Sequence, residues 1–183
     1  MTAQPMSKPV MESKSAADRV AVDEAARRAA FAAMNINPDT WLATDYLNHF
    51  NEAIMLLEMI PELPECAEDF LSWQPLSYAE HFVHSNFKGR DLAIAAYNQA
   101  PSAIRARFDE VCRTMTSILV AIREAVEQSN RDATKMRLAE QAVSWLKPLV
   151  GKAGGIINGT DAQSDTARPQ SDVDRIMSNS RTA

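Results

Sequence analysis

The chain contains 183 residues, of which 46% are apolar, and this is enough material for one hydrophobic core. Its net charge is −5 and its basic residues are not interleaved with aromatic ones, so nucleic acid is not an expected partner. The apolar run at residues 54–57 stops at Glu58, and no run approaches the roughly 18 residues that a membrane span needs. We therefore expect a single domain that crosses no membrane.

The cysteines and the N-terminal residues bear on the compartment and the chemistry. Cys66 and Cys112 lack the paired spacing of a metal or redox site, and the first residues contain no apolar secretory segment. These features predict reduced thiols and a cytoplasmic location. Neither cysteine has a base nearby in the sequence, and no glycine-rich phosphate loop is present. We therefore favour a non-enzymatic protein without a cofactor.

The body of the chain shows successive helix signals, without the alternating pattern of a strand. The first predicted helix, residues 15–35, is rich in alanine, so it has high helix propensity but little side-chain volume for packing. It is expected to be either closely packed or loosely attached. A second helix is predicted over residues 38–60, because Asn37 is an N-cap residue and Pro38 suits the first helical position.

Further helix signals follow. They predict helices over residues 65–73, 77–86, 91–99, 102–129 and 131–150, and Gly151 and the glycines after it are expected to stop the last one. The longest helix carries apolar residues alternately four and three apart, which is the seam of a helical bundle: Ile104, Phe108, Val111, Met115, Ile118, Ile122 and Ala125. The sequence therefore predicts an all-α fold, a single bundle of five to seven helices over residues 15–157, with disordered tails at residues 1–14 and 158–183.

Charge is unevenly distributed along the body. Residues 29–87 contain nine acidic residues and no Lys or Arg, whereas residues 88–152 contain eleven basic and seven acidic residues. The favoured interpretation is that the two halves pack together with complementary surfaces. The alternative is an acidic face that attracts a basic partner.

The histidines raise the question of a metal site. His81 and His84 are one helical turn apart, but a helix over residues 77–86 places both away from its apolar side, so we predict a solvated pair. That apolar side consists of Tyr78, Ala79, Phe82 and Val83. His49 has Asp45 one turn before it, which predicts a boundary histidine hydrogen-bonded to a carboxylate. No metal is expected, and a small metal- or cofactor-binding helical protein is the alternative, with His49, Glu52, His81 and His84 as its ligands.

The C-terminal tail carries the sharpest lead. Residues 158–168 contain no large apolar side chain, which predicts a flexible tether. Beyond it, Ser171 and Asp174 have the spacing of a helix N-terminus, and Val173, Ile176 and Met177 then share one face of a single turn. One turn is unstable alone in water, so its apolar stripe is expected to fold onto a partner surface.

This segment, residues 169–177, resembles the short peptides by which the flagellar motor switch protein and the chemotaxis phosphatase dock on the chemotaxis response regulator. The matching residues are Gln170, Asp172, Val173, Asp174, Ile176 and Met177, whereas Pro169 stands where the pattern has Ser, and Ile and Met stand where it has two Leu. The resemblance covers nine of the 183 residues and implies a response-regulator receiver domain as the partner of these six side chains.

These observations together favour a cytoplasmic, non-enzymatic helical adaptor that binds a protein partner, with the C-terminal peptide as its docking element. Besides the metal- or cofactor-binding alternative, a third possibility is a protein that coats an apolar surface with its alanine-rich first helix.

Overall fold

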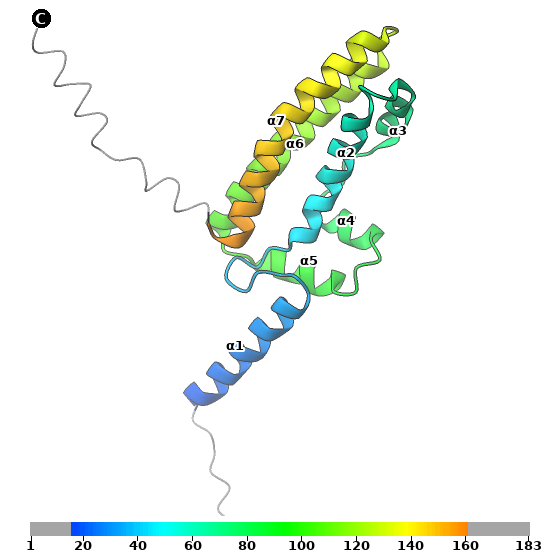
Figure 1. The fold of residues 1–183 in the computed structure, drawn as a ribbon. Helices are drawn as coiled ribbons and strands as arrows, with labels where there is room; N and C mark the ends of the chain where they lie inside the picture. The colour runs from blue at the N-terminus through cyan, green and yellow to red at the C-terminus, as the bar shows by residue number, and fades with distance from the viewer. Residues whose placement is uncertain (1–15, 161–183) are drawn as a thin grey trace, which may run out of the picture.

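In the computed structural model the described residues are 16–160, and they form the expected all-α fold (Figure 1). Seven α-helices and two short 3₁₀ helices, η1 and η2, make up this part of the chain. They are α1 (Ala16–Ala33), η1 (Thr44–Tyr46), α2 (Leu47–Met59), η2 (Pro64–Cys66), α3 (Ala67–Ser72), α4 (Tyr78–His84), α5 (Arg90–Gln99), α6 (Ser102–Glu127) and α7 (Asp132–Asn158). Within residues 16–160 the β structure is a single antiparallel bridge between Ile36 and Ala43.

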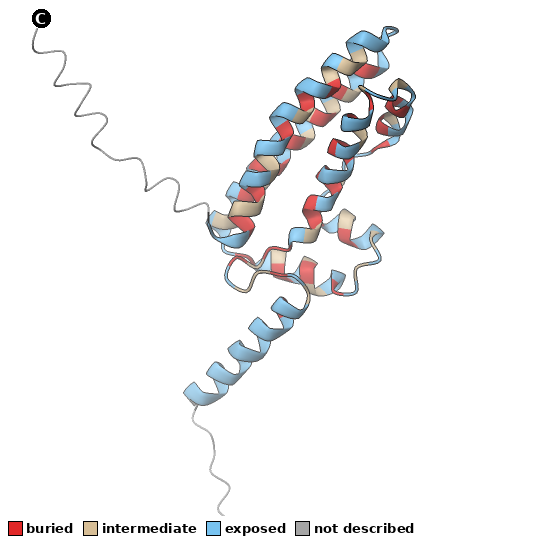
Figure 2. Ribbon diagram, in the orientation of Figure 1, coloured by how far each residue is buried: buried red, intermediate tan, exposed pale blue. Residues whose placement is uncertain are grey.

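The long helices α6 and α7 form an antiparallel pair, and α2 packs alongside α7 (Figure 1). Their shared interior is apolar, and Figure 2 shows the buried residues on the facing sides of these helices. On α6 the predicted seam is confirmed at Phe108, Met115 and Ile122, but burial also extends to Leu119 and Val126. The buried stripe is therefore wider than a strict four-and-three seam, because α6 packs against α3 as well as α7.

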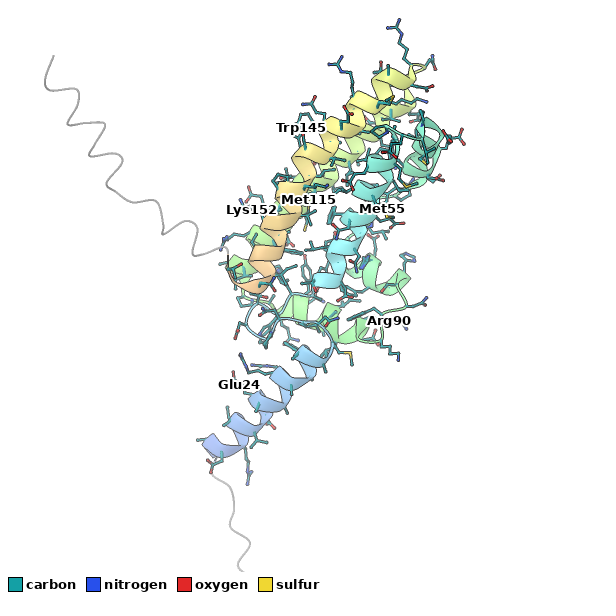
Figure 3. All side chains as sticks on the ribbon, viewed as in Figure 1. Glu24, Met55, Arg90, Met115, Trp145 and Lys152 are labelled. Atoms are coloured by element: carbon teal, nitrogen blue, oxygen red, sulfur yellow. The ribbon has the colours of Figure 1, made fainter. Side chains whose placement is uncertain are left out.

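The exposed large apolar side chains of the bundle are few, and the two that are neighbours on one helix are Met55 and Met59, one turn apart on α2. Met55 on α2 is 55% exposed and Trp145 on α7 is 48% exposed, and they extend from different helices (Figure 3). A few exposed apolar side chains of this kind are normal on protein surfaces. An ion pair between Glu58 and Lys147 joins α2 to α7, and so links the acidic and basic halves of the chain. None of the helices in the described part is long and apolar enough to cross a membrane.

The predicted start of the second helix at Pro38 is wrong. The Asn37 side chain does act as a cap, since its Oδ1 accepts the N–H groups of Asp39 at 2.9 Å and Thr40 at 3.1 Å. This cap closes only one turn, because Trp41 adopts a left-handed conformation with φ of 63°. The chain then bridges back at Ala43 and reaches α2 only at Leu47. The local start signal is therefore used for a turn instead of a helix.

The predicted stop of the last helix at Gly151 is also wrong, since α7 continues to Asn158 and ends at Gly159, which has φ of 70°. Three residues of this extension, Ala153, Ile156 and Ile157, are buried. Their burial stabilises helical turns that glycines would weaken in isolation.

Candidate functional site

The six predicted docking residues lie outside the described residues. They are Gln170, Asp172, Val173, Asp174, Ile176 and Met177. The docking segment therefore stays a prediction, and the sites that can be described lie within residues 16–160. Three features stand out there: the histidine cluster, the base and exposed face of α1, and a cleft beside α6.

His49 is a buried structural residue, with only 4% of its surface exposed. Its Nε2 accepts the backbone N–H of Leu76 at 3.0 Å, and its ring stacks on Trp73 with centroids 4.7 Å apart. The bond to Leu76 takes the place of the predicted bond to the Asp45 carboxylate. Burial and, to a smaller extent, the nearby His81 together lower the pKa of His49 to about 4. His49 is therefore neutral and holds residues 73–77 against α2.

His81 does not belong to a solvated pair with His84. Its ring is half-buried and lies 5.6 Å from the ring of Tyr46 and 6.0 Å from that of His49, measured between centroids. Burial lowers the pKa of His81, although a hydrogen bond to the backbone of Asp45 acts in the opposite direction. His84 is exposed, as predicted.

Val83, which the sequence placed on the apolar side of α4, is 57% exposed. The helix is therefore rotated about its axis relative to the prediction, because Tyr78 and Phe82 alone enter the core and His81 packs beside them. Glu52 is exposed on α2. Among the described residues no three His, Cys, Asp or Glu side chains are grouped so that they could hold a metal ion. The metal-binding alternative therefore finds no ligand cluster in residues 17–160.

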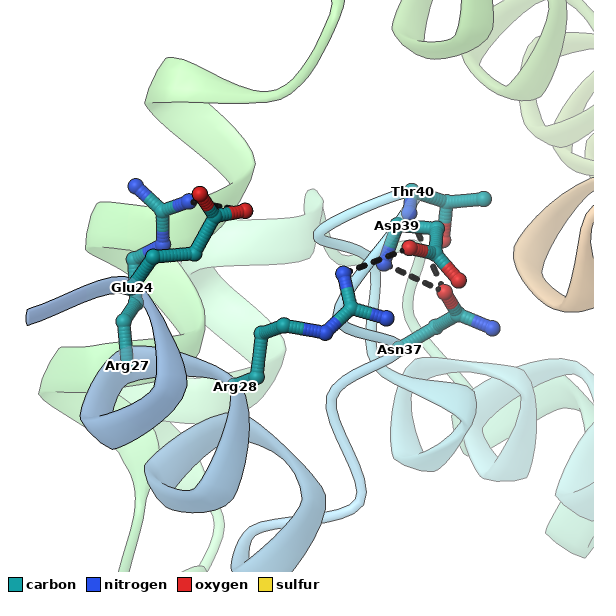
Figure 4. A network of polar contacts seen from close by, with 6 residues as sticks. All are labelled: Glu24, Arg27, Arg28, Asn37, Asp39 and Thr40. Carbon is teal, nitrogen blue, oxygen red and sulfur yellow. Dashed lines mark hydrogen bonds and ion pairs between the residues drawn. The ribbon is translucent and has the colours of Figure 1, made fainter. Parts of the chain in front are cut away.

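The base of α1 is held against the loop of residues 37–41 by a set of specific contacts, of which Figure 4 shows the ion pair between Arg28 and Asp39. Arg28 forms an ion pair with Asp39, with Nη1 2.7 Å from Oδ1. The guanidinium of Arg27 lies over the ring of Trp41, 4.6 Å from its centroid, and Phe31 meets the same ring edge-on at 5.6 Å. The aromatic and cationic contacts both converge on Trp41, which is the residue with the strained backbone.

The left-handed backbone of Trp41 costs energy, because bulky side chains rarely adopt positive φ angles. A hydrogen bond from Trp41 N–H to the carbonyl of Asn37, 2.8 Å long, helps to hold it there. Just after α1, Met34 packs so closely over Gly89 that a Cβ at position 89 would lie 2.9 Å from the Cβ of Met34. Asn35, with φ of 52°, ends the helix. Several unusual local features thus fix the direction in which α1 leaves the bundle.

The rest of α1 extends away from the bundle and is exposed, as Figure 2 shows. Among residues 17–33, Phe31 alone is buried. At about 100° of rotation per residue, the face opposite Phe31 carries small apolar side chains from Val22 to the end of the helix, with Asp18 on the same face nearer the N-terminus. The small apolar side chains are Val22, Ala25, Ala26, Ala29 and Ala33. The alanine composition left two states of this helix open, and the structure shows that residues 17–30 are not closely packed, so that α1 is attached at its C-terminal end.

A cleft of about 570 Å³ lies between α6 and the segment that joins α3 to α4. Pro75, Leu76 and Ser77 form one wall, and α6 forms the other with residues that include Asp109 and Arg113. No sequence pattern indicated this cleft, because its walls come from segments that are more than thirty residues apart. It is open to solvent at its rim, where the two charged side chains stand.

The cleft contains no activated nucleophile. Cys112 lines it but is buried, and burial raises the pKa of its thiol to about 12. A thiol of this kind stays protonated at neutral pH and is a poor nucleophile. The arrangement therefore suits binding better than covalent catalysis. No protein-family model matches the chain, and neither does any curated protein or solved structure, so function has to be inferred from these residues themselves.

Proposed function

We propose that this chain is a non-enzymatic helical adaptor that binds a protein partner through the exposed face of α1. The observation that supports this function is the combination of exposure and fixed direction in the 18-residue helix α1. It has one buried side chain in residues 17–33, and yet an ion pair, a cation–π contact and the strained Trp41 fix its base. The stability of the bundle does not require an exposed helix that is held in one direction. A helix that docks on a partner does require a fixed direction, because its face must meet the partner's surface.

The surface of α1 favours another helix as the partner. The face with Val22, Ala25 and Ala29 is formed by small side chains, so a second helix can approach at the short end of the usual 8–10 Å range of interaxial distances. Helices of this length are only marginally stable in water, and burial of one face against a partner would stabilise α1 as well. The docking mode is therefore helix-on-helix packing.

The surface-coating alternative is less well supported by α1. Insertion into an apolar surface relies on large apolar side chains gathered on one face. The exposed large apolar residues of α1 are Val20 and Val22, at 66% and 53% exposure. Two positions apart on a helix they point in nearly opposite directions, so they cannot enter one surface together.

The predicted C-terminal peptide gives the adaptor a second docking element in this proposal. Its partner is a response-regulator receiver domain, as the resemblance of residues 169–177 implies, and the working compartment is the cytoplasm. One short turn anchored by Val173, Ile176 and Met177 binds weakly, and tethering it to a chain that also carries α1 raises its effective concentration. The proposal therefore describes a protein that joins two partners.

The experiment compares two valine substitutions on α1 that are chemically identical. Val22→Glu places a charge on the small-residue face, and Val20→Glu places the same charge near the side of Phe31. We expect Val22→Glu to weaken capture of the partner from native lysate by about tenfold or more, since a buried unpaired charge costs more than ~1.4 kcal/mol, whereas Val20→Glu keeps it. Circular dichroism and thermal unfolding check that both variants keep the bundle intact.

The two docking elements are separated by a third variant. With Ile176→Ala, a receiver domain should be lost from the proteins captured from native lysate, while the partner of α1 is still captured. Titration with a purified receiver domain measures the lost affinity directly. If Val22→Glu and wild type capture the same proteins in the same amounts, α1 is not a docking helix. If Ile176→Ala leaves receiver-domain binding unchanged, the peptide assignment is wrong and the α1 proposal stands on its own.

A further inference from the structure

The cleft beside α6 has an uncharged aromatic floor. Tyr46, Tyr78 and Phe108 line it and are all buried. The hydroxyl of Tyr46 donates to the carbonyl of Leu76 at 2.8 Å, and that of Tyr78 accepts the N–H of Ala43 at 2.9 Å. Burial raises the pKa of both phenols, so they stay neutral. Because the hydroxyl groups have partners inside the fold, the floor offers mainly carbon surface, which suits a flat apolar group.

The rim of the cleft carries one acidic and one basic side chain. Asp109 and Arg113 stand one helical turn apart on α6. The hydroxyl of Tyr97 donates to Oδ1 of Asp109 at 2.7 Å, which orients this carboxylate and leaves its second oxygen as an acceptor. Tyr97 itself is held by stacking on Tyr78, with ring centroids 4.3 Å apart. Asp109 is therefore a positioned carboxylate at the edge of an apolar floor.

Arg113 differs from other arginines of the same helix. Arg105 donates to the carbonyl of Asn98 at 2.9 Å, and Arg123 donates to the carbonyl of Trp73 at 3.0 Å, so both serve to hold loops. Arg113 makes no hydrogen bond or ion pair with any residue in the part of the chain that the structure describes. Because the N–H groups of the Arg113 guanidinium have no acceptor among these residues and lie beside the cleft, they are suited to binding a carboxylate in bidentate geometry.

We propose that this cleft binds a small aromatic zwitterion such as an aromatic amino acid. The ring lies on the floor, the carboxylate binds Arg113, and the ammonium binds the free oxygen of Asp109. The cleft volume of about 570 Å³ falls within the usual range for small-molecule sites, which is roughly 300–1,000 Å³. This site is independent of the adaptor function, since it involves neither α1 nor the C-terminal peptide.

The pair of opposite charges selects a zwitterion over an anion or a cation. An aromatic carboxylate without an ammonium would face the repulsion of Asp109, and an aromatic amine without a carboxylate would face that of Arg113. Side chains one turn apart have Cβ atoms roughly 5–6 Å from each other, a separation that allows both to reach the adjacent charged groups of one α-amino acid.

Three indole compounds test the proposal on the full-length protein. L-Tryptophan carries both charges, tryptamine lacks the carboxylate, and indole-3-propionate lacks the ammonium. Binding is measured by isothermal titration calorimetry and by chemical-shift changes of the cleft residues. We expect L-tryptophan to bind more tightly than the other two, by about tenfold, which corresponds to ~1.4 kcal/mol for one lost charge contact.

Two charge-removing variants then assign each contact. Arg113→Gln should weaken L-tryptophan and indole-3-propionate and, by removing a repulsion, strengthen tryptamine slightly. Asp109→Asn should weaken L-tryptophan and tryptamine and strengthen indole-3-propionate slightly. Asn keeps an oxygen that can accept the Tyr97 hydroxyl, so the fold around it is preserved. The control variants are Glu110→Gln on α6 and Arg137→Gln on α7, which remove exposed charges outside the cleft lining and should leave all three affinities unchanged.

Two results would overturn the assignment. One is the absence of saturable L-tryptophan binding at millimolar concentration. The other is a variant pattern in which Arg113→Gln weakens tryptamine as much as indole-3-propionate. Unchanged thermal unfolding of Arg113→Gln, whose side chain is exposed, confirms that any loss of binding comes from the lost contact.

Discussion

Acidification should destabilise this protein through His49. In the folded state His49 is buried, accepts a hydrogen bond from Leu76 N–H through Nε2 and stacks on Trp73. Protonation would remove that acceptor and place a charge in the core. The folded-state pKa therefore lies below the unfolded value of 6.5, at about 4. His81 acts in the same direction, since its pKa is lowered as well.

The sign and the size follow from proton linkage. Above pH 6.5 the histidine is neutral in both states, and its full contribution to stability is present. As the pH falls below 6.5, the unfolded state takes up a proton that the folded state resists, so the free energy of unfolding decreases until the pH reaches about 4. With each pH unit contributing ~1.4 kcal/mol, the loss from His49 is about 2 kcal/mol at pH 5 and about 3 kcal/mol at pH 4.

The assay is urea unfolding followed by circular dichroism between pH 7 and pH 5. This window isolates the histidines, because the lowered pKa of Glu80 places its own loss of stability below its usual value of 4.5. His49→Gln keeps an oxygen that can accept the Leu76 N–H but cannot be protonated, so its stability should change much less across the window. His84→Gln is the matched control, since His84 is exposed, and it should follow the wild-type curve.

The reasoning about His49 is refuted by either of two outcomes. The first is a wild-type free energy of unfolding that stays constant between pH 7 and pH 5. The second is a His49→Gln variant that loses as much stability as wild type over this range, which would assign the effect to His81 or to another group.

Two further predictions concern the packing of α7. Thr40→Val removes the buried hydrogen bond, 2.6 Å long, from Oγ1 to the carbonyl of Ile157, and should lower the free energy of unfolding in urea by about 1–2 kcal/mol. The control Thr114→Val, at an exposed position, should lower it by less than about 0.5 kcal/mol. Equal effects of the two substitutions would contradict the prediction. Leu146→Ala truncates a fully buried side chain of α7 and should cost about 2–5 kcal/mol in the same assay, whereas Leu63→Ala, at 46% exposure, serves as the control and should cost much less.

Local chemistry in the sequence was sufficient to predict several elements. The capping box at Ser77 and Glu80 is formed as expected, with Ser77 N–H donating to the Glu80 carboxylate at 2.8 Å, so α4 begins where the sequence indicated. The long helix α6 lies within the predicted range of residues 102–129, because its apolar spacing persists over many turns. These predictions succeeded because the atoms that decide them are within one or two turns of each other.

Other features depended on contacts between distant segments. Helix α7 runs through Gly151 because Ile156 and Ile157 pack into the core. It also packs closely on α2 at Gly154, where a Cβ atom would lie 3.8 Å from Cδ1 of Leu47. Propensity alone disfavours that helix, and only the burial supplied by another element outweighs it. The cleft beside α6 likewise had no sequence signature, since its floor and rim meet only when the helices pack.

The amino-acid sequence by itself therefore determined the all-α class and most helix positions, since both depend on composition and on neighbours along the chain. Tertiary structure alone decided that the start signal at Asn37 closes a turn, that His49 pairs with Leu76 and that Asp109 and Arg113 border an aromatic floor. The physical reason is the range of the interactions: capping and propensity act within a few residues, whereas burial and packing join residues that the chain keeps far apart.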